Sequence, residues 1–585
     1  MTESVDANRC AVLATVLVGI VSMVFVTTGC ERPDWEDPDY VAEMLEEGDS
    51  SQRRLAVEQL RYFPEDRRDE IAESTANVYL EEERLRSDVM RRLIEWRLPG
   101  AKEAYLEELA EDHTGYGDAA ARTLGEIGAS DAIPRMIEVF DETGDNSRRV
   151  GILRGLSYMP EPDAIEKALE VFELDVDNYP IDLHRAACEF VGGLAQEQPE
   201  SVDEDLKRAL VFARFLSGED GRTTSEACGL AIQQVGPSMA PLLIEAFQGE
   251  NEDIQRLLMT YDSPGDNEHF PQNTSKHTAA EHLSALRAPE AVELYVEELE
   301  SEVEAPDLSG DRLGHWRATE VRTINEMVRG LGDIGDSDAR PILEATVQGE
   351  TFSDWEEVID GPAGFQMLQD SARALARLGD RDSRSTLMEM TGADIIPGMA
   401  ARFQAMERAA EEDDDINPVP LTEQLRPQWI AAQSFTLLAE AEDREEFESL
   451  VEEIEDEELN EKLASFTGAF DVMDECEEAD DDAAQAACFG GYIGSEDEHK
   501  ATKAVMELSR MPAVAAGPVV AEALDTRDLD LRETLTFAGY RVPSAELAAA
   551  IEDVLESESA RSGSEYQRDH RRLRMLQAWL QHQDT

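Results

Sequence analysis

A phrase of the form Leu-Gly-x-Ile-Gly recurs along this chain, each time followed by a segment that can form a helix. Its clearest copy is Arg329-Gly-Leu-Gly-Asp-Ile-Gly-Asp-Ser-Asp-Ala-Arg-Pro-Ile-Leu-Glu-Ala345. Apolar residues before the turn fall three or four positions apart, which places them on one helical face: Val321, Ile324, Val328 and Leu331. Gly335 can end that helix in a left-handed conformation, and Asp336 or Ser337 can cap the next one. The phrase therefore predicts a helix, a tight turn and a second helix.

The same phrase starts again at Leu124, and a looser copy, Leu-Ala-Arg-Leu-Gly, starts at Leu375. The turn glycines Gly335 and Gly379 are 44 residues apart, inside the period of about 40–47 residues that two-helix repeats show. Two short amphipathic helices cannot bury both of their apolar faces alone, so each pair needs neighbours. We therefore expect an all-α protein, an α-solenoid of stacked antiparallel helix pairs.

The turn phrase resembles that of HEAT repeats, and in particular the phycobilisome-lyase-like subset. The resemblance extends over about residues 40–558 and is strongest at 120–142, 320–348 and 366–390. It implies a superhelix of helix pairs that offers extended surfaces to a binding partner. Families of this kind share a shape rather than a reaction, so the resemblance implies no catalytic residue.

Breaks in the repeat pattern divide the chain into segments. The expected order is a signal peptide (1–29), a polar tether (30–39), a HEAT-like solenoid (40–400), an acidic insertion (401–425), further HEAT-like repeats (426–558) and a basic amphipathic helix (559–585). Two further polar insertions, Ser263–Lys276 and Ser301–Leu313, interrupt the first solenoid. Insertions in repeat arrays project as loops from one face, where a partner can be met.

The first 30 residues have the pattern of an export signal. Arg9 precedes an apolar run from Ala11 to Val26, which is short for a membrane-spanning helix and typical of a secretory signal. The run ends in Thr27-Thr-Gly-Cys30, which resembles the lipobox of bacterial lipoproteins. That resemblance implies a lipidated Cys30 at the start of a mature, exported chain, held at the periplasmic face of the envelope by either membrane. An uncleaved signal anchor is the alternative.

Acidic residues outnumber basic ones by 129 to 52, which gives a net charge of −77. A surface this acidic repels the phosphates of nucleic acids and anionic lipid headgroups, so nucleic acid is not expected as a partner. We interpret the charge as a halophilic surface, adapted to salt concentrations that screen its self-repulsion. A cationic partner and collective cation binding are the alternatives.

Four cysteines lie beyond Cys30. Cys476 and Cys488 have eleven residues between them, a spacing that suits a disulfide across the turn between two helices in an exported chain. Two unpaired thiols are the alternative for this pair. Cys188 and Cys228 lie 40 residues apart, at similar points of adjacent repeats. We interpret them as small buried side chains, with a bridge between stacked helices as the alternative.

Four histidines gather around the first two insertions: His269, His277, His282 and His315. The segment His277-Thr-Ala-Ala-Glu-His282 superficially looks like a metalloprotease helix, but a spacing of five residues turns the two rings apart. We therefore interpret the four as surface or turn histidines and predict no metal site, no cofactor and no catalytic residue. An enzyme or metal site built on the 263–315 insertions is the alternative.

A basic cluster lies near the end of this acidic chain: Arg561, Arg568, Arg571, Arg572 and Arg574. We interpret the segment as a terminal capping helix whose arginines lie against the acidic array. A free amphipathic helix that meets an acidic partner or a membrane surface is the alternative.

Together these features predict a lipid-anchored scaffold that binds a protein or peptide partner through surfaces shared by several repeats. We expect the second helix of each pair to line the concave face, with Glu293, Glu297 and Glu344 on the binding surface. A purely architectural component of the envelope is a further alternative.

Overall fold

The computed structural model describes residues 34–159, 162–173, 181–215, 221–261, 269–301, 311–348, 362–392, 421–558, 561 and 563–583. Within these ranges the regular structure is α-helix or short 3-10 helix, without a strand. The predicted all-α fold is therefore confirmed. The chain divides into two compact units between Glu107 and Glu108, a boundary that the repeat pattern did not indicate. Each unit is described by itself.

The first unit holds helices α2 (Pro38–Glu46), α3 (Ser50–Gln59), α4 (Ala72–Glu81) and α5 (Arg86–Trp96) and the first residues of α6 (Lys102–Glu111). A capping box starts α3: the carboxylate of Asp49 accepts bonds from the N–H groups of Ser51 and Gln52, and the Gln52 side chain accepts from the N–H of Asp49. Leu45, Val89 and Leu93 are fully buried between these helices.

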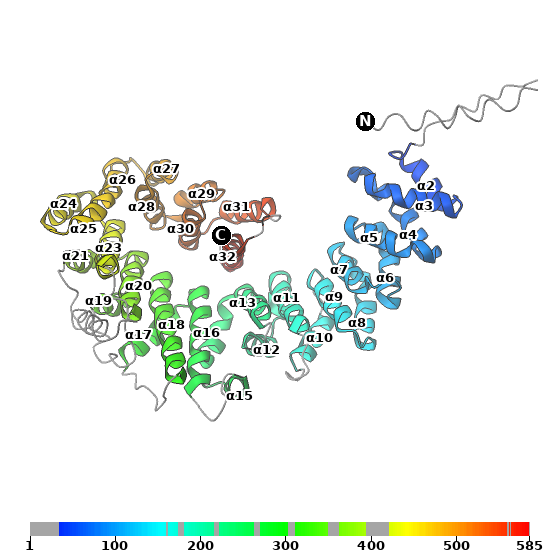
Figure 1. Cartoon of the computed structure of the whole chain (residues 1–585), viewed down its shortest axis with the longest axis horizontal. Coiled ribbons are helices and arrows are strands. Elements are labelled where there is room, and N and C mark those ends of the chain that lie inside the picture. Colours follow the sequence, from blue (N-terminus) through cyan, green and yellow to red (C-terminus); the bar gives the residue numbers. More distant parts are fainter. Residues whose placement is uncertain are drawn as a thin grey trace, which may run out of the picture. The chain divides into compact units, whose positions relative to one another are not determined.

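The second unit is built of helix pairs in two layers (Figure 1). The first helices of successive pairs lie side by side in one layer: α7 (Gly117–Glu126), α9 (Asn146–Ser157), α11 (Ile181–Glu197), α13 (Gly221–Val235), α16 (His269–Leu286), α18 (Asp311–Ile334), α20 (Pro362–Leu378) and α23 (Leu421–Leu438). Small residues let these helices approach closely, since a Cβ atom on Gly125 of α7 would meet the backbone of Gly155 of α9.

The second helices form the other layer: α8 (Ile133–Glu142), α10 (Pro162–Phe172), α12 (Glu204–Arg214), α14 (Ala240–Phe247), α17 (Glu290–Glu300), α19 (Arg340–Val347), α21 (Arg384–Gly392) and α24 (Arg444–Glu453). An extra short helix, α15 (Glu252–Tyr261), follows α14. The turns between the layers follow the recurring phrase. Gly335 has a φ of 80° after α18, and Asp336 accepts a hydrogen bond from the N–H of Asp338, as predicted.

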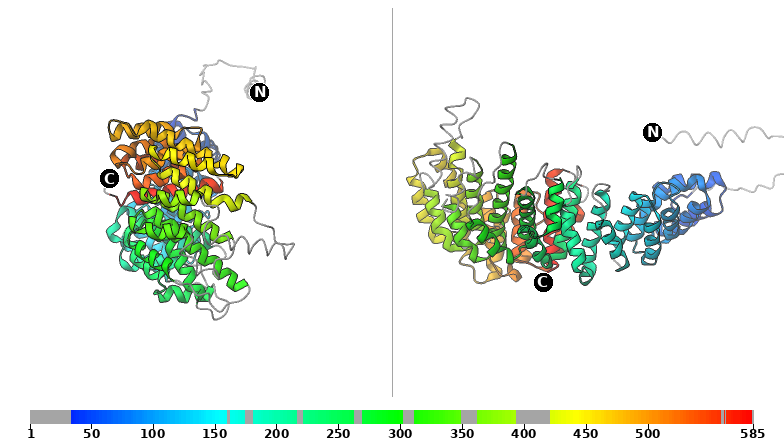
Figure 2. Two further views of the ribbon diagram at one scale, coloured as in Figure 1. Left: turned by 90° about the vertical axis from the view of Figure 1, so that its left-hand side faces the viewer. Right: turned by 90° about the horizontal axis from the view of Figure 1, so that it is seen from below.

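The C-terminal repeats comprise α25 (Glu457–Ala464), α26 (Gly468–Cys476), α27 (Asp482–Ile493), α28 (Glu498–Leu508), α29 (Ala513–Ala523), α30 (Leu529–Arg541), α31 (Ala545–Ser557) and α32 (Ser564–Leu580). From α26 onward these helices share one apolar core, which includes Phe489, Leu535 and Leu573. Instead of extending the stack, they return to the first-helix layer, where α28 packs against α23 and α32 packs against α13 (Figures 1 and 2).

Two disulfides lie in the second unit. Cys476 at the end of α26 is joined to Cys488 in α27, as the spacing predicted, with Cα atoms 5.6 Å apart. Cys188 of α11 is also joined to Cys228 of α13, with Cα atoms 4.8 Å apart. Our preference for two unpaired buried side chains at these positions is therefore wrong. The reason is that α11 and α13 are neighbours in the first-helix layer and present the two residues to each other.

Peptide mapping of the protein under non-reducing conditions is expected to find both pairs, 188–228 and 476–488. Closing loops of these lengths contributes on the order of 3–4 kcal/mol each on the chain-entropy model. Replacing Cys476 and Cys488 together by serine should therefore loosen α26 and α27 before other helices, as measured by hydrogen exchange. Four thiols that alkylate freely in the folded protein would contradict this arrangement.

Several of the predicted features concern residues outside the described ranges, and others differ from what the structure shows. Cys30, the leader and most of the 401–425 insertion lie outside, although α23 already begins at Leu421. The segment expected as a loop up to Lys276 is helical from His269 onward. In the described ranges, Glu226–Phe247 is long and apolar enough to span a membrane, but 61% of its most apolar window is buried and Gly236 bends it. These features make it a core segment of the solenoid.

Candidate functional site

Cations from the C-terminal repeats bind the carbonyl ends of helices in the first-helix layer. Arg541, at the end of α30, donates to the carbonyls of Gly332 (3.0 Å) and Arg377 (3.3 Å), which end α18 and α20. Arg510, just after α28, donates to the carbonyls of Ala376 (3.2 Å) and Leu437 (2.8 Å), which end α20 and α23. A helix leaves its last carbonyl groups unpaired and carries partial negative charge there, so guanidinium groups stabilise these ends.

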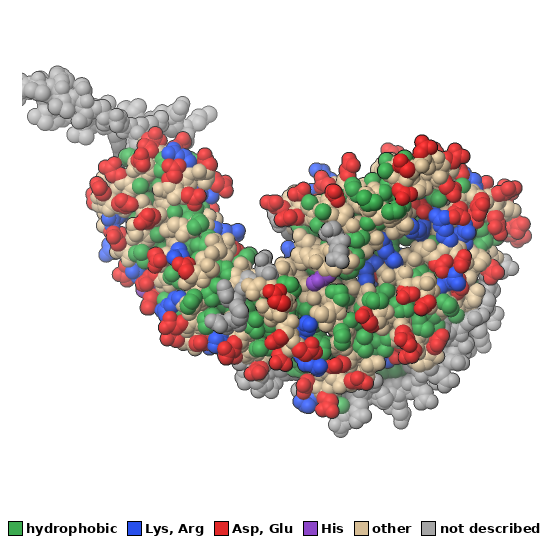
Figure 3. Space-filling model, turned by 180° about the vertical axis from the view of Figure 1, so that it is seen from behind, with side chains coloured by type: hydrophobic (Ala, Val, Ile, Leu, Met, Phe, Trp, Pro, Cys, Tyr) green, Lys and Arg blue, Asp and Glu red, His purple; other side chains and the backbone are tan. Residues whose placement is uncertain are grey.

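Two further donor side chains, Lys503 and His582, make contacts of the same kind. The ammonium group of Lys503 donates to the carbonyls of Leu437 (3.1 Å) and Ala439 (2.7 Å), and the His582 ring donates to Gln234 (2.8 Å), at the end of α13. We call these contacts of Lys503, Arg510, Arg541 and His582 the fold-back interface. Figure 3 shows Lys and Arg side chains gathered in the hollow between the C-terminal repeats and the first-helix layer, on a face whose rim is mostly acidic.

The turn glycines make room for this interface. A Cβ atom on Gly335 would collide with the guanidinium group of Arg541, and one on Gly236 would collide with the ring of His582. Gly128 holds the corresponding place in the copy at residues 124–142, and a Cβ atom there would meet nothing within 4 Å. Where the C-terminal repeats cover the recurring turn, its glycine therefore also leaves space for the side chain that packs on it.

Arginines and aromatic rings pack together beside the interface. The Arg287 guanidinium lies 4.2 Å from the ring centre of Tyr540 and donates to the carbonyl of Asp333. Arg377 lies 5.4 Å from the ring centre of Phe537 and pairs with the Asp333 carboxylate at 2.9 Å. Burial, followed by the charge of Arg287, lowers the pKa of Arg541 to about 10. Three guanidinium groups, those of Arg287, Arg377 and Arg541, therefore lie near the single carboxylate of Asp333, in a chain of net charge −77.

A pocket of about 640 Å³, here called the inner pocket, opens between the first-helix layer and the C-terminal repeats. One wall comes from α16, α18 and α20 and the other from α30 and α32. Its charged lining contains five arginines and five acids: Arg287, Arg329, Arg373, Arg377, Arg572, Glu281, Glu326, Asp333, Asp370 and Glu533. A volume of this size is typical of small-molecule and peptide sites.

The repeat period orders these charges in rows. Glu281, Glu326 and Asp370 are 45 and 44 residues apart, so they occupy equivalent places on α16, α18 and α20. Arg329 and Arg373 follow one helical turn later. The Arg329 side chain lies between two acids, 3.5 Å from a Glu326 oxygen and 3.8 Å from an Asp370 oxygen, and remains 47% exposed. The acid row is therefore only loosely neutralised at α18.

Two carboxylates of the pocket lack full pairing. Burial raises the pKa of Glu326 to about 7, although the charge of Arg329 lowers it in part. This carboxyl group is therefore partly protonated near neutral pH. Asp370 is 7% exposed, and its Oδ2 atom accepts no hydrogen bond from the described residues. Buried oxygens of this kind normally have a partner, so they are candidates for ligand contact.

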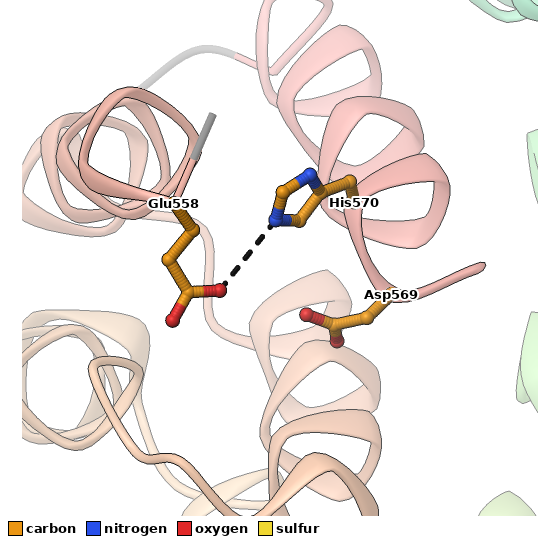
Figure 4. Close-up of side chains that lie close together, drawn as sticks. All are labelled: Glu558, Asp569 and His570. Atoms are coloured by element: carbon orange, nitrogen blue, oxygen red, sulfur yellow. Dashed lines mark ion pairs between the residues drawn. The ribbon is translucent and has the colours of Figure 1, made fainter. Parts of the chain in front are cut away.

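A separate buried cluster closes the C-terminal repeats. Figure 4 shows Glu558, after α31, close to Asp569 and His570 of α32. These three offer ligand atoms within 4.8 Å of one another, a spacing that a metal ion could use. Arg532 of α30 already supplies the positive charge there, with its Nη1 atom 3.0 Å from Glu558 and 2.6 Å from Asp569. We therefore interpret the cluster as an ionic contact that joins α30, α31 and α32.

Of the four histidines expected at the surface or in turns, the structure describes the side chains of two, and one of these is buried. His282 is 2% exposed, so its assignment as a surface residue is wrong. Burial, followed by the charge of Arg214, lowers the pKa of His282 to about 3, and its Nε2 atom accepts a bond from Arg214 Nε at 2.6 Å. His277 is half-buried on the same helix. The side chains of His269 and His315 lie outside the described part of the structure.

The glutamates expected on a concave binding surface lie in the second-helix layer. Glu293 and Glu297 are exposed on α17, and Glu344 is half-buried on α19. The inward layer, which faces the C-terminal repeats, is made of first helices, so the expectation that second helices line it is wrong here. The C-terminal arginines lie against acids as expected: Arg571 is 3.6 Å from Glu281 and Arg572 is 2.8 Å from Glu533.

Comparison with known proteins agrees with the repeat geometry. The family described as PBS lyase HEAT-like repeat matches residues 118–142, which cover α7 and α8. The chain is an α-solenoid that contains a HEAT-like repeat at residues 118–142. No curated protein sequence matches it.

Solved structures with a similar course of helices include Kap121p and importin beta. Kap121p, in its complex with Ste12p, has 11% identity and a TM-score of 0.44 over 94% of this chain and 66% of Kap121p. Importin beta has 13% identity and a TM-score of 0.34 over 93% of this chain and 77% of importin beta. The chain thus spans just under two thirds of the Kap121p length. At such low similarity the likeness indicates neither a partner nor a function for this chain.

Proposed function

We propose that this chain is an exported, lipid-anchored HEAT-repeat scaffold that binds a protein or peptide partner at the periplasmic face of a bacterial envelope. The inner pocket carries the proposal of binding. It opens between stacked helices and is lined by ionic side chains, of which Glu326 and Asp370 are not fully paired by the described residues. Clefts with a few convergent polar groups are the usual place of ligand binding.

The chemistry of the pocket supports binding rather than catalysis. Its two aliphatic hydroxyl groups, on Ser284 and Thr536, are engaged within the structure. Ser284 shares a hydrogen bond with the Tyr295 hydroxyl at 3.2 Å, and Thr536 donates to the carbonyl of Arg532 at 2.8 Å. A nucleophile would need a base within hydrogen-bond reach instead. Among the described lining residues, no hydroxyl is paired in that way.

The disulfides support the proposal of export. Disulfides form and persist in oxidising compartments such as the bacterial periplasm, and are rare in the cytosol. The second unit places Cys188 next to Cys228 and Cys476 next to Cys488. The leader with Cys30 supplies the proposed address, and a covalent lipid would add about 0.8 kcal/mol of membrane affinity for each buried CH₂ group.

Replacing Cys30 by serine is expected to block lipidation and cleavage. The Cys30→Ser chain should keep its apolar leader, which an intact-mass measurement detects. Because it lacks the lipid, its partition between membrane and soluble fractions should differ from that of wild type. The matched control is Cys10→Ser, which lies in the leader and should be processed normally. A Cys30→Ser chain with the mature mass and membrane partition of wild type would refute the anchor.

Glu293, Glu297 and Glu344 lie in the second-helix layer, outside the inner pocket lining, and we propose that they form a second contact surface for the partner. Reversing their charge to lysine is expected to weaken partner capture and to leave helicity intact. Charges at the rim of an interface act mainly on association rate, so the loss should appear as slower binding that added salt also weakens. Capture from detergent-solubilised membranes with the lipidated protein measures the effect. Reversal of Glu452, Glu453 and Glu457, three charges on α24 and α25, is the control. Equal capture by both variants would exclude the face formed by α17 and α19 as the binding surface.

A further inference from the structure

Two acidic groups at one end of the inner pocket are incompletely hydrogen-bonded by their arginine partners. Asp370 on α20 is more than nine-tenths buried; its Oδ1 atom accepts from Arg373 at 3.2 Å, but its Oδ2 atom lies 3.8 Å from Arg329 and accepts no hydrogen bond from the described residues. Glu326 on α18 is 19% exposed and has Arg329 at 3.5 Å as its ion-pair partner. Both side chains line the pocket. The Arg329 side chain between them is 47% exposed, so a ligand donor that displaced it would satisfy the Oδ2 atom of Asp370.

Two arginines at the other end have N–H groups to spare. Arg287 has no carboxylate partner among the described residues, since it donates to a backbone carbonyl of Asp333 and stacks on Tyr540. Arg377 shares a single carboxylate, that of Asp333, and is 30% exposed. Both line the pocket. Paired guanidinium groups bind a carboxylate in a bidentate manner, and here their aromatic neighbours hold them in place.

Helix geometry gives the separation of the two ends. Glu326 precedes Asp333 by seven residues on α18, and Asp370 precedes Arg377 by seven residues on α20. At a rise of 1.5 Å per residue, the acid end and the arginine end lie about 10 Å apart along the helices. An extended peptide of three residues also spans about 10 Å between its terminal charges.

We propose that the inner pocket binds an extended peptide of about three residues with free ends. Its ammonium group lies at Glu326 and Asp370 and its carboxylate at Arg287 and Arg377. This inference rests on the proposed binding function and specifies the ligand of that site. The pocket volume of about 640 Å³ suits such a ligand.

The geometry favours an organic ammonium group over a metal ion at the acid end. A bound divalent cation needs several ligand atoms within a few ångströms of one another. Among the described residues, the group that meets this spacing is Glu558, Asp569 and His570, which does not include Glu326 or Asp370. An ammonium group has three donors and can serve two more distant carboxylates.

The binding of trialanine to the full-length protein, measured by calorimetry, tests the proposal. Three matched probes separate the parts of the ligand: N-acetyl-trialanine lacks the ammonium charge, trialanine amide lacks the carboxylate, and dialanine is too short. We expect trialanine to bind, and each of the other probes to bind at least tenfold more weakly. These probes leave the protein unchanged, so folding does not affect the comparison.

Asp370→Asn tests whether the ammonium group of the peptide binds at the acid end of the pocket. The substitution keeps the shape of the side chain and is expected to remove most of the preference for trialanine over its acetylated form. The control is Asp382→Asn, which removes the same charge at a side chain that is 83% exposed, outside the pocket lining. Unchanged discrimination in Asp370→Asn, or equal affinity for trialanine and its blocked forms, would overturn the proposal. So would an absence of binding at millimolar trialanine. Partner capture that persists in those cases would leave the wider binding function standing.

Discussion

Replacing Arg532 by methionine is expected to destabilise the C-terminal repeats by about 3–5 kcal/mol, the cost of breaking a buried ion pair from one side. Arg532 is fully buried, and its guanidinium lies 3.0 Å from Glu558 and 2.6 Å from Asp569, which are themselves almost fully buried. Methionine fills similar space but leaves Asp569 without its cation and leaves Glu558 with Arg561, at 2.7 Å, in place of the buried guanidinium. Hydrogen exchange in α30, α31 and α32 measures the local opening free energy.

The matched control is Arg444→Met. Arg444 also pairs with two carboxylates, Asp471 at 2.8 Å and Asp474 at 2.7 Å, but it remains 28% exposed, so we expect a loss of about 1 kcal/mol or less. Similar losses in both variants would contradict a special role for the buried cluster.

The effect of Arg532→Met should depend on pH. Burial alone would raise the pKa of Glu558, but hydrogen bonds and charge from Arg532 hold it below its ordinary value. A carboxyl group with a depressed folded pKa contributes stability above its unfolded pKa, about 4.3, and loses it as pH falls through the folded pKa. The difference between wild type and variant should therefore be full at pH 7 and shrink below about pH 4. A difference that grows on acidification would contradict this account.

Replacing Gly335 by alanine is expected to open the fold-back interface, at a cost of about 3–5 kcal/mol. A left-handed conformation costs a residue with a Cβ atom about 1–2 kcal/mol. The Cβ atom would also displace Arg541 from the carbonyls of Gly332 and Arg377. Hydrogen bonds to a charged group contribute about 1.5–3 kcal/mol. Faster hydrogen exchange in α30 and at the end of α18 would report the opening.

Gly128→Ala separates the two contributions. Gly128 has a φ of 67° in the same turn phrase, but a Cβ atom there meets nothing within 4 Å. It should show the backbone cost alone. In an Arg541→Ala background, Gly335→Ala should fall to the same cost as Gly128→Ala, because the clash partner is gone. Equal costs for Gly335→Ala and Gly128→Ala in the otherwise wild-type chain would contradict a role of the turn in the interface.

The sequence predicted the helix pairs because their determinants are local. The spacing of Ile324, Val328 and Leu331 defines a helical face, and Gly335 with Asp336 defines the turn that follows. Each of these features acts within a few residues, so the repeat could be recognised without knowledge of its neighbours. The Cys476–Cys488 pairing was accessible for the same reason, since it spans a single turn.

The fold-back could not be predicted in this way. Its contacts join residues far apart in the chain: Arg541 is 209 residues from Gly332, and His582 is 348 residues from Gln234. A repeat period specifies which pair is next in the stack but not that a stack returns to its own first-helix layer. The acid row at Glu281, Glu326 and Asp370 is visible as a period of 44–45 residues. That α30 and α32 cover it to make a pocket depends on the fold-back.

The same limit explains the errors at Cys188 and His282. Cys228 faces Cys188 because α11 and α13 are adjacent in the first-helix layer, and His282 is buried because Arg214 from another pair packs on it. Both depend on packing between pairs. Residue spacing along one helix, on which the sequence argument relied, contains no information about it.

A zero-length carbodiimide cross-link tests the fold-back most directly. Arg571 of α32 lies 3.6 Å from Glu281 of α16, and both are 39% exposed. In an Arg571→Lys variant of the full chain, the new amine should form an amide with Glu281, which mass spectrometry of the digested protein would identify. The native pair of Lys500 and Asp471, 2.6 Å apart within the C-terminal repeats, is the internal control. Joined peptides from positions 281 and 571 are the predicted result. Their absence in a sample in which Lys500 and Asp471 are joined would contradict the return of the C-terminal repeats to the first-helix layer.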